Sequence, residues 1–347
     1  MKPICAALLF AVFLSGTVLS GTAASAAAPL YRLTETIPLG GDVKWDYLYL
    51  DPVTGHLLVS HGSELTAVDV DAGRIAGELT GLRGSHGIAV DPATGLGYAD
   101  SGKSATVSIF DAKSLHVLRT LPALEDADGM VFDAVSNQVF IAGGDAQAVL
   151  AVDAAGTRHP RLIPLAGSPE FLVADGNGDL FVNIHDKNQV VKIDTARDAI
   201  TARWDLPGCV GPTGLAVDPR NQRLFSTCRN GRMAVLDTGS GKLIALLPIG
   251  GGTDAARFDP KTNLVFSSNR DGTLSIIHEL DGQHFQVLPA VETALGARTM
   301  EIDPKNGDVF LVTADVLGAS PATSPGQTPK YNFKPGSCKL LVYQPRS

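Results

Sequence analysis

Seven polar residues occur at one equivalent position of a repeat, five residues before a recurring aspartate. The set combines four carboxylic acids with an imidazole, a guanidinium and a hydroxyl, which are groups that bind ions, form hydrogen bonds and transfer protons. If the repeat builds equivalent strands, these side chains form a ring on one face of the protein. In chain order they are Asp46, His86, Asp128, Glu170, Thr213, Asp254 and Arg298.

Further polar residues stand at the ends of the strands that follow, and we expect them on the same face: His61, Asn183, His185 and Asn269. Together with the titratable members of the ring, they are the candidate ligand-binding residues. We name this face, which carries the starts of the innermost strands, the top face.

A divalent cation is one ligand that such a set suits. Imidazole with carboxylate favours Zn or Mn, whereas carboxylates with amide and carbonyl oxygens favour Ca. His86, Asp128 and Glu170 are the first candidate metal ligands. The alternative is that these side chains cap connecting loops and pair with Arg298 or with one another, because no ligand spacing such as H-E-x-x-H occurs.

The recurring aspartates show which elements must position this ring, since they follow one another at spacings of 40 to 44 residues. A period of this length, with about four short apolar runs per unit, is typical of a β-propeller blade. Each aspartate leads a turn such as DPVTG or DPKNG, so we interpret it as a turn residue whose carboxylate accepts backbone N–H groups. They are Asp51, Asp91, Asp133, Asp175, Asp218, Asp259 and Asp303.

The sequence therefore predicts an all-β fold, a seven-bladed β-propeller of four-stranded antiparallel blades. Its last blade shows only three strand patterns before the chain ends at Ser347. Residues 29–40 resemble the fourth strands of the other blades, and pairing them with the last strand closes the ring and hides two sheet edges. Residues 315–338 interrupt this blade and are rich in Pro, Ser and Gly, which predicts a long top-face loop. Such a loop is either a lid over the channel mouth or a mobile excursion.

The N-terminus has the pattern of a secretory signal peptide. A basic Lys2, an apolar run and an Ala24-Ser25-Ala26 cleavage site predict that residues 1–26 are removed and that 27–347 form a single propeller domain. The apolar run is too short for a membrane span, so we expect a periplasmic or secreted protein that is not membrane-embedded. In such a compartment Cys209 and Cys228, which flank a predicted hairpin, are expected to form a disulfide.

Composition and motifs argue against nucleic acid, nucleotide and quinone ligands. The net charge of −8 disfavours nucleic acid, whose binding requires basic side chains to neutralise phosphates. No nucleotide motif occurs, and Trp45 and Trp204 do not supply the repeated tryptophan endings of quinone-dependent propellers. The segment DGNGD (175–179) has oxygen ligands at alternating positions but lacks the acidic end of an EF-hand loop, so we interpret it as a turn.

Two sets of residues on the innermost strands have both structural and functional interpretations. Arg257 and Glu301 occupy the same strand position in adjacent blades, which suggests an interblade ion pair or, alternatively, a general acid with its electrostatic partner. The aromatic residues Trp45, Tyr47 and Phe171 suit packing between blades or the lining of a ligand pocket.

The ordered set of motifs resembles the YncE-like, YVTN-repeat family of secreted bacterial propellers. The motifs include WDYLYLDPVTG (45–55), HGIAVDP (86–92), CVGPTGLAVD (209–218), SSNRDGTLSII (267–277) and RTMEIDP (298–304), and the full set covers nearly the whole mature chain. The resemblance implies a seven-bladed propeller outside the cytoplasm, but it carries no catalytic residue.

We therefore expect the protein to act in binding or as a scaffold, with a small ligand or a protein partner bound at the channel mouth. The alternative is a metal-dependent lactonase-like hydrolase or lyase that uses the polar ring. SPEF (168–171) and DGNGDLF (175–181) are similar to repeats of the SMP-30/gluconolactonase family, although that family's metal ligands cannot be matched here residue by residue.

Overall fold

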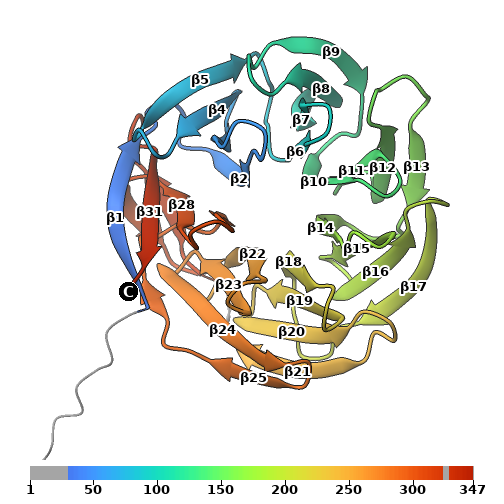
Figure 1. Ribbon diagram of the computed structural model, residues 1–347. Helices are drawn as coiled ribbons and strands as arrows, with labels where there is room; N and C mark the ends of the chain where they lie inside the picture. The colour runs from blue at the N-terminus through green and yellow to red at the C-terminus, as the bar shows by residue number, and fades with distance from the viewer. Residues whose placement is uncertain (1–29, 323–327, 347) are drawn as a thin grey trace, which may run out of the picture.

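The computed structural model describes residues 30–322 and 328–346, and the predicted signal peptide (1–26) lies outside the described residues. Seven blades surround a central channel, each a twisted antiparallel sheet whose first strand is innermost (Figure 1). The predicted propeller is therefore confirmed.

The strand bounds follow the repeat. Blade 1 contains β2 (Trp45–Leu50), β3 (Leu57–His61), β4 (Glu64–Asp69) and β5 (Arg74–Thr80), and blade 2 contains β6 (Ile88–Asp91), β7 (Leu96–Ser101), β8 (Thr106–Asp111) and β9 (Val117–Pro122). Blade 3 contains β10 (Ala127–Asp133), β11 (Gln138–Gly143), β12 (Ala148–Asp153) and β13 (Arg161–Pro164), and blade 4 contains β14 (Pro169–Ala174), β15 (Asp179–Ile184), β16 (Gln189–Asp194) and β17 (Ala199–Asp205). Blade 5 contains β18 (Pro212–Asp218), β19 (Arg223–Cys228), β20 (Arg232–Asp237) and β21 (Leu243–Pro248). Blade 6 contains β22 (Thr253–Asp259), β23 (Leu264–Asn269), β24 (Thr273–Asp281) and β25 (His284–Val287), with the short β26 (Val291–Glu292) also paired to β24.

Blade 7 is closed by both ends of the chain, as predicted. Its order is β27 (Met300–Ile302), β28 (Val309–Thr313), β31 (Lys339–Pro345) and β1 (Tyr31–Pro38). Strand β1 pairs antiparallel with β31 from Tyr31↔Pro345 to Pro38↔Lys339, and the two lie side by side in Figure 1. The N-terminal strand thus covers an edge that the C-terminal strand leaves open.

The core lies between blades, because successive side chains of a strand point to opposite faces of its sheet and both faces are covered. One equivalent position of the second strand carries a large side chain in every blade, and each is at most 1% exposed: Leu58, Tyr98, Phe140, Phe181, Phe225, Phe266 and Phe310. These side chains fill the wedges between neighbouring sheets and hold the innermost strands at fixed positions.

The recurring aspartates build turns, as expected. In all seven blades the carboxylate accepts the backbone N–H two residues further on, at 2.9 Å for Asp51 and Val53 and at 2.8 Å for Asp303 and Lys305. These turns lie at the ends of the innermost strands, on the face opposite the ring.

The 315–338 insertion differs from the prediction of a long loop. It contains an antiparallel hairpin of β29 (Val316–Ser320) and β30 (Lys330–Phe333). The Phe333 ring packs edge-on against Trp45 with centroids 4.9 Å apart, which places the hairpin beside the channel mouth. Tyr331 and Phe333 are aromatic residues, which favour strands, but the Pro-rich sequence around them is typical of a loop.

The predicted disulfide is present. Cys209 and Cys228 are bonded with their Cα atoms 5.4 Å apart, and Pro212 lies opposite Cys228 in the β18–β19 pair. The disulfide agrees with folding in an oxidising compartment. Among the described residues, no helix is long and apolar enough to cross a membrane.

Candidate functional site

The ring predicted from the sequence assembles at the top end of the channel. Asp46, Asp128, Glu170 and Asp254 lie on the innermost strands of blades 1, 3, 4 and 6, which surround the channel in Figure 1. Their charges act on one another: burial and then repulsion from Glu170, Asp46 and Asp254 raise the pKa of Asp128 well above its usual range. The fold therefore gathers four carboxyl groups from different blades in one partly buried place.

Glycines allow this close approach. A Cβ added at Gly87 would lie 2.3 Å from the carbonyl oxygen of Asp128, and one at Gly129 would lie 2.8 Å from that of Glu170. Because any side chain there would collide with the next innermost strand, glycine directly after His86 and after Asp128 keeps neighbouring ring residues close.

The carboxyl groups differ in their partners. Burial, offset in part by Arg298, raises the pKa of Asp46 to about 6, while burial and Asp254 raise that of Glu170 to about 7. Glu170 accepts a hydrogen bond from Arg229 Nη2 at 3.1 Å. Within the described residues, neither Asp46 nor Asp128 has a side-chain hydrogen bond or ion pair.

Arg298 is committed to the ring. Its Nε donates to Asp254 Oδ2 at 2.5 Å, its Nη2 donates to the Trp45 carbonyl at 3.2 Å, and its guanidinium lies 5.8 Å from the Trp45 ring centroid. Although burial opposes its charge, Asp254 and Asp46 raise the pKa of Arg298. The arginine is therefore a permanent cation that neutralises one acid of the four.

His86 is likewise held by neighbours. Its Nδ1 lies 2.8 Å from the Ala127 carbonyl and 3.5 Å from Asp100 Oδ2, and its backbone N–H donates to Asp100 Oδ1 at 2.7 Å. Burial disfavours the imidazolium, but Asp100 and then Asp46 outweigh burial and raise the pKa of His86 to about 9. At neutral pH this residue is a cation paired with the buried Asp100.

Arg229 belongs to the mouth, and the sequence prediction missed it. Its Nη1 lies 3.2 Å from His185 Nε2 while Nη2 binds Glu170, so one side chain joins both predicted residues. Burial and Arg229 together lower the pKa of His185, which is therefore neutral. The segments FSTCRNG (225–231) and FSSNRDG (266–272) place Arg229 and Arg270 at the same repeat position, and this alignment was the available signal.

Three predicted residues are placed in the interior of the blades. Asn183 donates to the carbonyls of Thr213 and Gly214, Asn269 bonds to Thr273 and Ser275, and His61 Nε2 contacts the Asp42 carbonyl. Each of the three is 0% exposed. Their side chains connect strands and loops and are not accessible to a ligand at the mouth.

The predicted metal ligands do not form a metal-binding group. In residues 30–322 and 328–346, no three His, Cys, Asp or Glu side chains gather closely enough to hold a metal ion, His86, Asp128 and Glu170 included. The alternative metal-dependent hydrolase or lyase would need a ligand set that these side chains do not form in this conformation.

An aromatic pair forms the floor of the mouth. The rings of Tyr47 and Phe171, from blades 1 and 4, lie 4.9 Å apart between centroids. Burial and the charges of Asp128, Asp254 and other ring acids raise the pKa of Tyr47 well above its usual range, which places its hydroxyl among the acids. The mouth is therefore polar above and bordered by two aromatic rings below.

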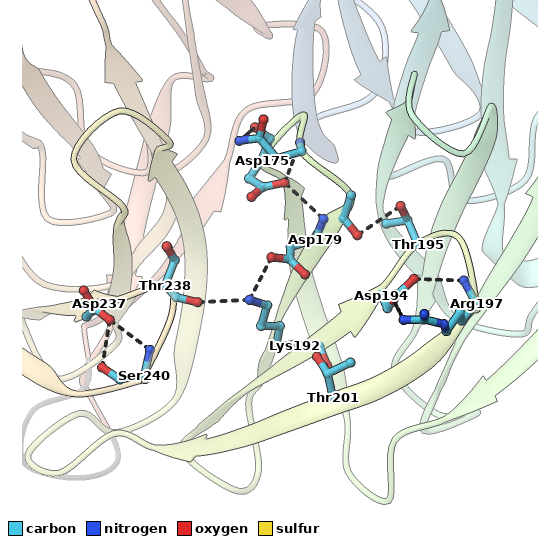
Figure 2. A network of polar contacts seen from close by, with 12 residues as sticks. Asp175, Asp179, Lys192, Asp194, Thr195, Arg197, Thr201, Asp237, Thr238 and Ser240 are labelled. Carbon is cyan, nitrogen blue, oxygen red and sulfur yellow. Dashed lines mark hydrogen bonds and ion pairs between the residues drawn. The ribbon is translucent and has the colours of Figure 1, made fainter.

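The polar residues on the opposite face have structural roles. Figure 2 shows Asp175 accepting N–H bonds within the DGNGD turn, while Lys192 joins Asp179 at 2.7 Å to the Thr238 carbonyl at 3.2 Å. This network connects blades 4 and 5 and confirms DGNGD as a turn.

Comparison with solved structures shows the same fold. The chain is similar to the crystal structure of RRP9 WD40 repeats, with a TM-score of 0.74 and 11% identity over 91% of this chain and 97% of the other. It is also similar to U3-55K, with a TM-score of 0.72 and 11% identity over 90% and 98% of the two chains. A chain of Kuenenia stuttgartiensis hydrazine synthase matches with a TM-score of 0.67 and 14% identity over 85% and 96%. No family model and no curated protein sequence matches the chain.

Proposed function

We propose that this protein is an exported, non-enzymatic binding propeller that holds a cationic group of a small ligand or protein partner at its channel mouth. We include in the proposal its membership of the YncE-like, YVTN-repeat family and a periplasmic or secreted location. The expected ligand group is an ammonium or a guanidinium.

The proposal rests on the surroundings of Asp128. Its carboxyl group is partly buried, lacks a hydrogen-bonding partner among the described residues, and is surrounded by Glu170, Asp46 and Asp254. Such crowding of like charges is unfavourable unless protons or a cation compensate it. A ligand cation among these groups would relieve the repulsion and satisfy the unpaired acid.

The other charges leave room for that ligand. Arg298 forms an ion pair with Asp254, and His86 forms one with Asp100. Neither cation is therefore paired with Asp128. Among the ring acids of the described residues, Arg229 pairs with Glu170 alone, and its side chain is half exposed, at 50%. The ring acid that these cations leave without a partner is therefore Asp128.

Thermal-shift and NMR titrations with n-butylammonium, and with n-butanol as the neutral control, test the proposal. We expect the ammonium to raise the melting temperature and the alcohol to leave it unchanged, because a ligand that binds only the folded state stabilises it. Asp128→Asn should weaken ammonium binding about ten- to hundredfold, the worth of one charge-assisted hydrogen bond. The same exchange at the exposed Asp71, on the opposite face, should have no effect. Equal responses to ammonium and alcohol would refute the proposal.

A further inference from the structure

The channel also contains a cavity that is distinct from the mouth. Below the aromatic pair is a cavity of about 250 Å³ with largely apolar walls. Residues from all seven blades contribute to these walls, among them Ile88, Met130, Val131, Val173, Leu215 and Phe258. Apolar walls make poor contacts for water, so the cavity favours an apolar occupant.

The charged groups in this cavity neutralise each other. Arg257 Nε and Nη2 donate to the two Glu301 oxygens at 2.8 and 3.1 Å. Two further N–H groups of Arg257 donate to the carbonyls of Ala256 at 2.8 Å and Leu48 at 3.5 Å. Because the bidentate pair occupies the guanidinium, the cavity offers no free charge to an ionised ligand.

The size of the cavity restricts the ligand. An engineered protein cavity of about 150 Å³ with apolar walls binds benzene. The larger volume here, about 250 Å³, suits a fused two-ring molecule. We propose that this cavity binds an uncharged aromatic molecule of about two rings, enclosed by the strands that form the channel.

The entrance is on the face of the aspartate turns. A groove of about 740 Å³ between blades 7 and 1 shares four lining residues with the cavity: Tyr49, Arg257, Phe258 and Glu301. On the other side, Tyr47 and Phe171 separate the cavity from the mouth. The site is therefore independent of the proposed cation site, and either can fail without the other.

Indole is the probe for this site, and the anionic indole-3-carboxylate is its charged counterpart. Calorimetric and thermal-shift titrations of the full mature chain should show indole binding with a raised melting temperature. The carboxylate should bind at least about tenfold more weakly, because burying a charge in an apolar site is costly. Failure of indole to bind, or equal binding of the two probes, would overturn the proposal.

Variants locate the bound probe. Val131→Phe and Val173→Phe each add a ring to the cavity wall and should reduce indole affinity about tenfold or more. The matched exchange Val135→Phe is on an exposed turn, where the residue is 53% exposed, and should leave binding unchanged. Circular dichroism and melting curves establish that each variant is folded before titration. If both folded cavity variants bind indole as tightly as wild type, the site is not in this cavity.

Discussion

Tyr47 and Phe171 meet across the channel from non-adjacent blades, with their ring planes inclined by 62°. The pair divides the channel into an acidic mouth and an apolar cavity. Arg257 also lies 5.4 Å from the Phe171 ring centroid, so the division is supported from below by a cation–π contact. An acidic region and an apolar region therefore lie within one channel.

Phe171→Ala should remove this division. Since Phe171 is 8% exposed, we expect a loss of about 2–4 kcal/mol in the free energy of unfolding, as for other buried aromatic truncations. Urea denaturation measures the loss. Leu162→Ala, at a residue that is 55% exposed, is the control and should change the free energy by less than about 0.5 kcal/mol. Equal stability of the two variants would show that the pair does not contribute to packing.

Arg298→Met should destabilise the protein because it leaves Asp254 and Asp46 without their counter-cation. Breaking such a partly buried pair costs about 2–4 kcal/mol. The loss should be smaller at pH 5, where more of the ring is protonated, and the double variant Arg298→Met/Asp254→Asn should recover part of it. Denaturation curves of the single and double variants at pH 5 and pH 8 measure this coupling, and additive effects would contradict it.

Deprotonation of His86 should lower the stability of the folded protein at alkaline pH. Its pKa rises from 6.5 to about 9 on folding, so its contribution is fully present below pH 6.5 and is lost as pH rises through 9. We expect about 1–3 kcal/mol less stability at pH 9.5 than at pH 6.5 from this group, and no such component in His86→Gln. NMR titration of the imidazole, with exposed His284 as the reference signal, measures the pKa directly. A pKa near 6.5 for His86 would contradict the assignment.

Ionisation of Glu279 should destabilise the folded protein, whereas ionisation of an acid in a salt bridge stabilises it. It is 0% exposed, both of its oxygens lack hydrogen-bond partners among the described residues, and burial with nearby Asp218 raises its pKa to about 7. The folded state therefore holds a proton that the unfolded state releases near pH 4.5, so stability falls as pH rises from 4.5 to 7. Glu279→Gln should gain roughly 1–3 kcal/mol over wild type at pH 8 and much less at pH 4.5. Denaturation curves at both pH values test this, and a pH-independent difference would contradict it.

Repetition explains what could be predicted from the sequence. The aspartate spacing located every blade, the closing strand and the ring position, because a propeller repeats one local pattern. The contact of Tyr47 with Phe171 could not be predicted, since spacing along the chain does not show which residues meet across the channel. Arg229 was missed because it follows a strand instead of lying on it. Asn183 and His61 bind carbonyls of neighbouring segments, and spacing along the chain does not show those contacts.

If the mouth holds a ligand cation among its acids, the cation replaces protons there, and calorimetry in two buffers of different ionisation enthalpy detects that exchange. Burial and neighbouring acids raise the pKa of Asp128 well above its usual range and that of Glu170 to about 7, so binding of n-butylammonium should release protons and strengthen from pH 6 to pH 8. In Asp128→Asn the proton release should fall and the affinity should drop about ten- to hundredfold. Binding without proton release, with the same affinity in wild type and Asp128→Asn, would contradict the account.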